Sequence, residues 1–96
     1  MQTGNTTPEH FIATIRDSFK DAEYVYLNGS CFEFYKILKC VFPDAEPYYD
    51  AVTCHIFTKI GSGYYDIRGR IRPTLEVCDP LRNRPDTVRK IHRWRP

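Results

Sequence analysis

The amino-acid sequence predicts an α+β fold, with two N-terminal helices packed on a small antiparallel sheet and a short C-terminal helix. Residues 6–42 carry apolar side chains at helical spacing, and residues 52–71 carry two β-branched and aromatic runs around Gly-Ser-Gly. Residues 85–94 begin with proline and return to helical spacing. Because the helices and strands are segregated rather than alternating, the α+β class is favoured. A chain of 96 residues is expected to form a single domain, residues 1–96.

The first predicted helix lies in TTPEHFIATIRDSFKD, residues 6–21. Thr7 suits the N-cap position and Pro8 suits the first helical position. The apolar residues recur at helical spacing and predict one buried face, which consists of Phe11, Ile12, Ile15 and Phe19. The following AEYVYL is a short apolar run that we interpret as a strand or an extended approach to the next helix.

The second predicted helix follows a turn at Asn28-Gly29. Ser30 and Glu33 have the spacing of a capping box, so the helix is expected to begin at Cys31. Pro43 is expected to end it at about Phe42.

The sheet is predicted mainly as one hairpin. VTCHIFTKI and YYDIRGRI, residues 52–60 and 64–71, flank a glycine-containing turn and are expected to pair as antiparallel strands. TLEVC, residues 74–78, is a candidate further strand, and PDTVRKIHRW, residues 85–94, is the predicted C-terminal helix.

Composition excludes several classes of protein. No stretch approaches the roughly 20 apolar residues of a membrane span, and the polar N-terminal segment does not resemble a secretory signal. The four cysteines, at 31, 40, 54 and 78, are therefore expected to be reduced in a cytoplasmic protein, although three disulfide pairings are formally open. Since no C-x-x-C pair occurs, neither a metal site nor another cofactor is predicted.

Charge is unevenly distributed along the chain. Residues 1–67 hold five Lys or Arg against nine Asp or Glu, a net −4, whereas residues 68–96 hold nine against three, a net +6. The basic tail is a candidate surface for a protein partner, with nucleic acid a less favoured one; its candidate contact residues are Arg82, Arg84, Arg89, Lys90 and Arg93. The alternative is that the tail is a solvated helix face.

Cys31 is the candidate nucleophile. A thiolate is the reactive form of cysteine, and the unpaired amides at a helix N-terminus stabilise negative charge. The same amides, that of Cys31 included, are suited to receive the oxyanion of an acyl intermediate. The alternative interpretation is that Cys31 is a small buried residue, as free cysteines usually are.

His55 and Asp66 are the candidate base and orienting acid. Each is an ionisable residue within an apolar run, and the two runs are the expected hairpin partners. If Lys59 lies opposite Tyr64, His55 and Asp66 point to the same face and sit diagonally; a slip of one residue would separate them. A satisfied core histidine beside a solvated aspartate is the alternative.

The segments NGSCFEFYKIL and HIFTKIGSGYYDI, in this order, resemble the papain-like cysteine hydrolase and transferase superfamily, in particular its transglutaminase-like and NlpC-type members. In that superfamily a cysteine that begins a helix is followed by a strand histidine and then by an aspartate or its equivalent. The resemblance implies that Cys31 is the nucleophile, His55 the base and Asp66 the orienting residue.

Two functions of different class follow from the sequence. The first is a minimal cysteine hydrolase or acyltransferase that acts on an amide or thioester substrate. The second is a non-catalytic phage or mobile-element protein that binds and inhibits a host complex, in the manner of an anti-CRISPR inhibitor, through surfaces rich in tyrosine and arginine.

Overall fold

The computed structural model describes residues 6–27 and 30–84. Three helices, α1 (Pro8–Arg16), α2 (Ala22–Leu27) and α3 (Cys31–Val41), precede the sheet. The strands are β1 (Glu46–Asp50), β2 (His55–Ile60), β3 (Gly63–Asp66), β4 (Gly69–Ile71) and β5 (Cys78–Pro80), with short 3₁₀ turns η2 (Leu75–Val77) and η3 (Leu81–Asn83). The predicted α+β class is confirmed, whereas the predicted C-terminal helix falls outside the described residues.

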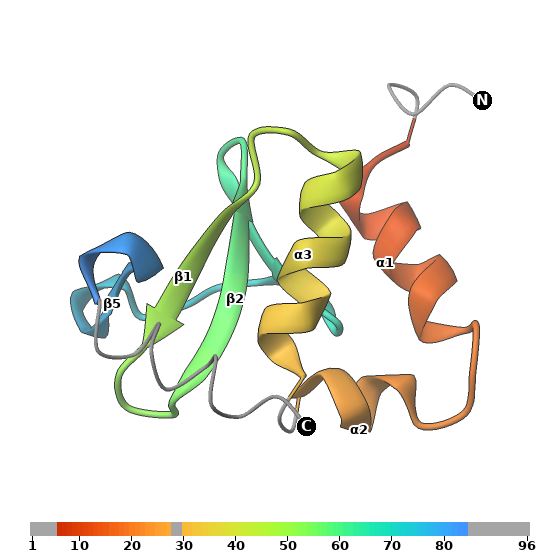
Figure 1. Ribbon diagram of the computed structural model, residues 1–96, viewed down its shortest axis with the longest axis horizontal. Helices are drawn as coiled ribbons and strands as arrows, with labels where there is room; N and C mark the ends of the chain where they lie inside the picture. The colour runs from red at the N-terminus through yellow and green to blue at the C-terminus, as the bar shows by residue number, and fades with distance from the viewer. Residues whose placement is uncertain (1–5, 28–29, 85–96) are drawn as a thin grey trace.

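The five strands form one antiparallel sheet in the order β4-β3-β2-β1-β5. Helices α1 and α3 lie on one side of this sheet, and α2 joins them (Figure 1). Because β4 and β5 are at opposite edges, residues 72–77 must cross the sheet, and they pass on the side away from α3 (Figure 1).

The main core lies between the helices and the inner face of the sheet. Ile12 of α1, together with Phe34 and Leu38 of α3, packs against Ile60 and Tyr65 of the sheet. Each fully buried aliphatic or aromatic side chain of this kind contributes about 1.5–3 kcal/mol through removal of its surface from water. A smaller cluster of Cys31, Ile56 and Leu81 places the N-terminal end of α3 over the beginning of β2.

The outer face of the sheet carries an aromatic cluster, Tyr48, Phe57 and Tyr64, with ring centroids 5.6–5.8 Å apart. Alternation along β2 places Phe57 on this face and Ile56 on the inner one. Phe57 is buried on the outer face, between the rings of Tyr48 and Tyr64.

Helix α3 begins at Cys31 as predicted, but the capping-box prediction is wrong. The side chain of Ser30 makes no capping hydrogen bond, and Glu33 forms an ion pair with Lys36. The N-cap prediction for α1 is confirmed, since the Thr7 side chain accepts a hydrogen bond from the His10 amide at 3.1 Å.

Two further predictions about the helical region are corrected. The run AEYVYL is helix α2 rather than a strand, because Ala22 and Tyr26 are inward-facing at helical spacing while Glu23 is exposed. The first helix ends at Arg16, before the left-handed residue Asp21, and Phe19 is consequently 44% exposed.

The sheet also differs from the single predicted hairpin. Its second run is divided into β3 and β4 by a turn at residues 67–68, and TLEVC forms η2 and only the beginning of β5. Strand β1 was not predicted, since Pro47 argues against a strand interior. Pro47 is tolerated because the ladder with β5 begins one residue later, at Tyr48.

Candidate functional site

Cys31 lies at the first position of α3, where it packs against Ile56 and Leu81. The side chain of His55 and the backbone amides of Ile56 and Cys31 lie near enough to the thiol to lower its pKa. The first hydrogen bond of the α3 ladder is donated by the Phe34 amide to the Ser30 carbonyl, at 3.0 Å. The amide of Cys31 precedes this ladder and therefore has no acceptor within the helix.

His55 is the first residue of β2, and the register of β2 with β3 places it on the same face as Asp66. The ladder joins Lys59 to Tyr64, which is the register that places His55 and Asp66 on one face, and it extends only as far as Thr58. His55, three residues before Thr58, therefore lies beyond the ladder and is not covered by β3.

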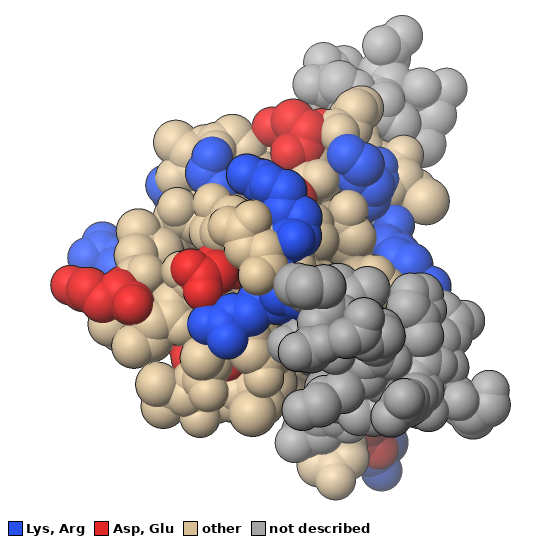
Figure 2. All heavy atoms as spheres, turned by 60° about the vertical axis from the view of Figure 1, so that its left-hand side comes forward, with Lys and Arg blue, Asp and Glu red and all other residues tan. Residues whose placement is uncertain are grey.

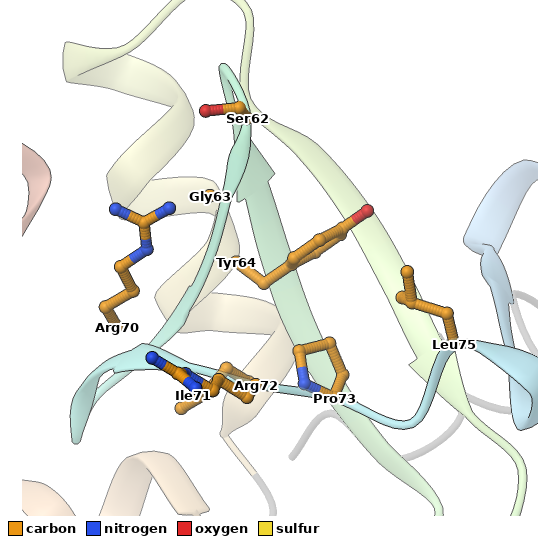
Figure 3. A pocket seen from close by; sticks show the side chains of 8 residues that line it. All are labelled: Ser62, Gly63, Tyr64, Arg70, Ile71, Arg72, Pro73 and Leu75. Carbon is orange, nitrogen blue, oxygen red and sulfur yellow. The ribbon is translucent and has the colours of Figure 1, made fainter.

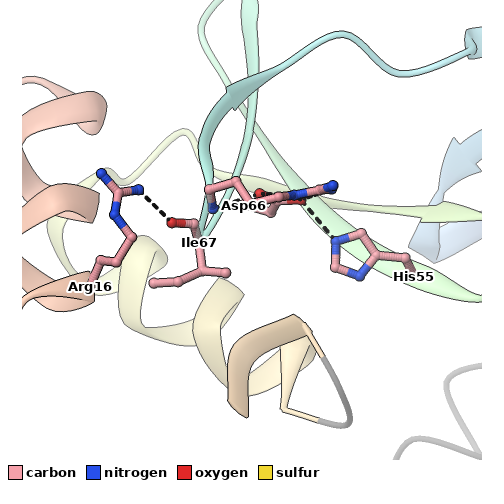
Figure 4. A network of polar contacts seen from close by, with 5 residues as sticks. Arg16, His55, Asp66 and Ile67 are labelled. Carbon is pink, nitrogen blue, oxygen red and sulfur yellow. Dashed lines mark hydrogen bonds and ion pairs between the residues drawn. The ribbon is translucent and has the colours of Figure 1, made fainter. Parts of the chain in front are cut away.

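Asp66 ends β3 and contacts His55 diagonally, with 3.1 Å between Nε2 of His55 and Oδ2 of Asp66 (Figure 4). The side chains are 14% and 2% exposed, respectively, so water screens the pair only weakly. Since Nε2 is engaged by the carboxylate, Nδ1 is the ring nitrogen left for the sulfur. The structure thus joins His55 and Asp66 directly, and Cys31 lies near enough to His55 for each to shift the pKa of the other.

Arg68 is the site residue that sequence reasoning missed. Its backbone amide donates to Oδ1 of Asp66 at 2.8 Å, and its Nε donates to Oδ1 and Oδ2 at 3.2 and 3.1 Å. The Arg68 guanidinium therefore contacts both carboxylate oxygens and shares Oδ2 with His55. Only a weak signal for this contact was present in the sequence, namely an arginine two residues after Asp66, because residues 67–68 form a turn.

A second arginine fixes the turn that carries this carboxylate. Arg16 of α1 donates from a guanidinium nitrogen to the carbonyl of Ile67 at 2.9 Å (Figure 4). Because Ile67 follows Asp66 directly and is itself fully buried, the turn is held to the helical layer. Asp66 is consequently fixed by its own strand, by Arg68 and by the anchored turn.

The electrostatics of the site lower the pKa of the Cys31 thiol and raise that of the His55 imidazole. Burial alone would raise the pKa of Asp66, but hydrogen bonds from His55 and Arg68 lower it to about 2. Burial would lower the pKa of His55, but its hydrogen bonds with Asp66 and Cys31 raise it to about 9. Burial would likewise raise the pKa of Cys31, yet the hydrogen bonds from His55 and the Ile56 amide leave it below its ordinary value.

The other three cysteines lack this environment. Cys40 is exposed late in α3, and Cys54 is exposed in the turn before β2, with φ of 58°. Cys78 is buried, and burial together with the nearby Asp50 and Asp79 raises its pKa. All four thiols are free. Residues 6–27 and 30–84 contain no group of three or more histidine, cysteine or acidic side chains arranged to hold a metal ion.

The predicted basic surface is only partly described. Arg82 forms an ion pair with Glu46, and Arg84 donates to Asp79 at 2.8 Å and lies 5.6 Å from the centroid of the Tyr49 ring. Arg89, Lys90 and Arg93 lie outside the described residues. Figure 2 shows basic and acidic side chains interspersed on one face of the molecule. In the described part of the chain, no helix is both long and apolar enough to cross a membrane.

The fold and the site define a small α+β protein with a partly buried thiol–imidazole–carboxylate series. Residues 10–93 match the family described as Phage YunG-like protein, and the chain therefore belongs to this family of phage proteins. No curated protein shows significant similarity to the chain, and no solved structure does.

The family match corrects the resemblance to the papain-like superfamily, which was wrong. That resemblance depended on a helix-initiating cysteine and two strand residues at loose spacing. Such an arrangement reflects the local chemistry of a thiol beside an imidazole and can occur on unrelated folds. The geometry around Cys31 is therefore interpreted below from its own contacts.

Proposed function

We propose that this phage protein is a cysteine-dependent acyl-transfer enzyme that acts on an amide or thioester substrate. The observations that support the proposal are the 3.1 Å contact between His55 and Asp66 and the opposite pKa shifts that His55 and Cys31 cause in each other. In this series Cys31 is the nucleophile, His55 exchanges the proton, and Asp66 holds the imidazole ring in position. The free thiols suit a reducing compartment such as the cytoplasm of a host cell.

The reaction takes place in two stages. The Cys31 thiolate attacks the carbonyl carbon, a C–S bond forms, and the carbonyl electron pair moves onto oxygen, where the amide at the start of α3 stabilises it. As the intermediate collapses, the bond to the leaving amine or thiol breaks and the His55 imidazolium supplies its proton. Water, or an acceptor nucleophile, then transfers a proton to His55 and attacks the acyl-cysteine. The C–S bond breaks, the acyl group is released on the new nucleophile, and the Cys31 thiolate and His55 imidazolium are restored.

The direct test is acylation by a generic activated ester, p-nitrophenyl acetate, with the acyl group located by mass spectrometry of the intact and digested protein. A rapid release of nitrophenolate in proportion to protein, with the acetyl group on Cys31, is expected. Cys31→Ala should abolish the rapid phase, and the matched control Cys40→Ala should retain it. An equal rapid phase in wild type and Cys31→Ala would show that Cys31 is not the nucleophile.

A second candidate function is supported by the family itself. A small phage protein that binds and inhibits a host complex needs no thiolate, and membership in a phage family suits that role. The candidate contacts are the basic residues of the tail, namely Arg82, Arg84, Arg89, Lys90 and Arg93. Of these, Arg82 and Arg84 have acidic partners within the chain, which reduces the charge they offer to another protein.

The two functions are separated by a pair of variants. For the binding function, reversal of charge at Arg89 and Arg93 should weaken capture of a host complex, and added salt should weaken capture by the wild type. Cys31→Ala should leave that capture unchanged. If Cys31→Ala abolishes the activity of the phage protein and the charge reversal at Arg89 and Arg93 does not, the enzyme is favoured.

A further inference from the structure

The backbone amide of Ile56 lies where the pairing of β2 with β3 ends. Directly after β1, the Ala51 amide donates to the Val77 carbonyl at 3.1 Å, on the side of β5. Backbone groups of successive strand residues face alternate neighbours, so those of Asp50 face β2, where Asp50 pairs with His55. The same alternation along β2 directs the backbone groups of His55 towards β1 and those of Ile56 towards β3.

Strand β3 offers the Ile56 amide no acceptor. The ladder between β2 and β3 ends at the pair Thr58–Tyr65, and in its register the residue opposite Ile56 would be Ile67. Ile67 lies instead in the turn after β3, where its carbonyl accepts from Arg16 at 2.9 Å. Within residues 6–27 and 30–84, the Ile56 N–H therefore has no acceptor in the sheet. A buried N–H group normally has a partner, so this one is available to a group outside the sheet.

The Cys31 thiol lies beside this amide. Cys31 packs against Ile56 at the N-terminal end of α3, and the Ile56 amide lies near enough to the thiol to lower its pKa. The amide of Cys31 has no acceptor within its helix either. Two backbone donors without partners in their own elements thus lie near one sulfur. When that sulfur attacks a carbonyl, a single carbon atom separates it from the oxygen, so the same donors are close to the oxygen as well.

We propose that the Ile56 amide is a second donor to the oxyanion of the acyl intermediate, beside the amide of Cys31, a role that rests on the proposed function. As the C–S bond forms, the negative charge passes from sulfur to the carbonyl oxygen, and the Ile56 N–H donates to that oxygen. Because β2 is paired with β1 from His55 to Lys59, this donor is held in place before a substrate arrives. Donors fixed in advance are those that stabilise an oxyanion most.

The test replaces one backbone amide by an ester, which exchanges the N–H for oxygen and keeps the side chain. The full chain is assembled by ligation of peptide segments at Cys54, with the α-hydroxy analogue of isoleucine at position 56. The rapid phase of acylation by p-nitrophenyl acetate should slow by about 10²–10³, the usual effect of removing one oxyanion donor. Circular dichroism confirms that each ester variant is folded.

The matched control is an ester at Arg70. By the same alternation, the Arg70 amide faces outwards from the edge strand β4, while the preceding carbonyl faces a neighbouring strand, as it does at position 56. Arg70 lies two strands from β2, in the wall of a cavity of about 700 Å³ beside Tyr64 (Figure 3). This variant should be acylated at the wild-type rate.

A second reaction separates stabilisation of the oxyanion from stabilisation of the thiolate. Alkylation by iodoacetamide forms no oxyanion, so on the plateau of its pH–rate profile it should proceed in the Ile56 ester as in the wild type. Equal slowing of acylation and alkylation, or acylation at the wild-type rate, would overturn the proposal. Absence of a rapid phase in the wild type would instead refute the proposed function itself.

A third measurement needs no variant. Acetaldehyde adds to a cysteine thiol as a thiohemiacetal, whose oxygen occupies the position of the oxyanion. In the wild type, its addition should move the Ile56 amide proton downfield in the NMR spectrum and leave that of Arg70 in place. An adduct on Cys31 with an unchanged Ile56 resonance would overturn the proposal.

Discussion

Asp66→Asn tests whether the carboxylate of the site acts through its charge. The substitution keeps the size of the side chain and an oxygen that can accept from His55, but it removes the negative charge. The pKa of Asp66 is lowered from 3.8 to about 2, and a difference of this size corresponds to about 2 kcal/mol of unfolding free energy near neutral pH. The side chain is 2% exposed, so solvent screening reduces this figure little. We therefore expect the variant to be less stable by about 2 kcal/mol near pH 6.

The pH dependence distinguishes charge from packing. Because the folded pKa of Asp66 is lower than the unfolded one, its contribution is present above about pH 4 and is lost as pH falls through about 2. The folded pKa of His55 is raised from 6.5 to about 9, so its contribution is present below 6.5 and is lost as pH rises through about 9. The difference in unfolding free energy between wild type and Asp66→Asn should therefore be largest between about pH 4 and pH 6.5, where both contributions are present.

The assay is urea unfolding followed by circular dichroism at several pH values on the acid side. The control is Asp17→Asn, because Asp17 is an exposed residue at the C-terminal end of α1, and its change should stay within about 0.5 kcal/mol. A difference for Asp66→Asn that stayed constant from pH 6 down to pH 2 would refute the reasoning, since only packing would then be lost.

Three further predictions concern single positions. The alkylation rate of Cys31 by iodoacetamide should reach half its maximum at lower pH than that of exposed Cys40, because the pKa of Cys31 is lowered; the reverse order in mass-spectrometric mapping would contradict this. Thr7→Ala should cost about 1 kcal/mol in urea unfolding and Ser30→Ala clearly less, since only Thr7 makes a capping hydrogen bond; equal costs would be inconsistent with the two caps. Gly63→Ala should lower stability by roughly 1–3 kcal/mol, because its Cβ would lie 2.6 Å from the hydroxyl of the tyrosine two residues later; an unchanged melting temperature would contradict that contact.

The sequence predicted those parts of the fold that are determined by residues close together in the chain, such as helix caps and short turns. Thr7 and Pro8 predicted the start of α1, and the pairing of Lys59 with Tyr64 is one of the two registers that the sequence left open for the β2–β3 hairpin. The start of α3 at Cys31 was predicted for a partly wrong reason, because the Ser30 side chain does not cap it.

The parts that sequence did not predict depend on distant partners. Strand β1 contains Pro47 and is a strand only because β2 and β5 pair on its two sides. The contact of Arg68 with Asp66 depends on the turn that separates β3 from β4, which the continuous run YYDIRGRI does not indicate. The cavity at Tyr64 depends on the crossing of the sheet by residues 72–77, and no local pattern indicates a crossing.

Burial of the Asp66 carboxylate is energetically costly, and fold stability alone does not explain it. A carboxylate that is 2% exposed loses most of its hydration, and burial of an ion pair often gives no more stability than apolar side chains of the same size would. Arg68 alone satisfies both carboxylate oxygens, so His55 is not required to compensate the charge. An aliphatic residue at position 66, packed against apolar neighbours, would stabilise the end of β3 at least as much as the ion pair does. The arrangement becomes advantageous when His55 must carry a proton beside Cys31, because the buried carboxylate is what keeps that imidazole charged and oriented.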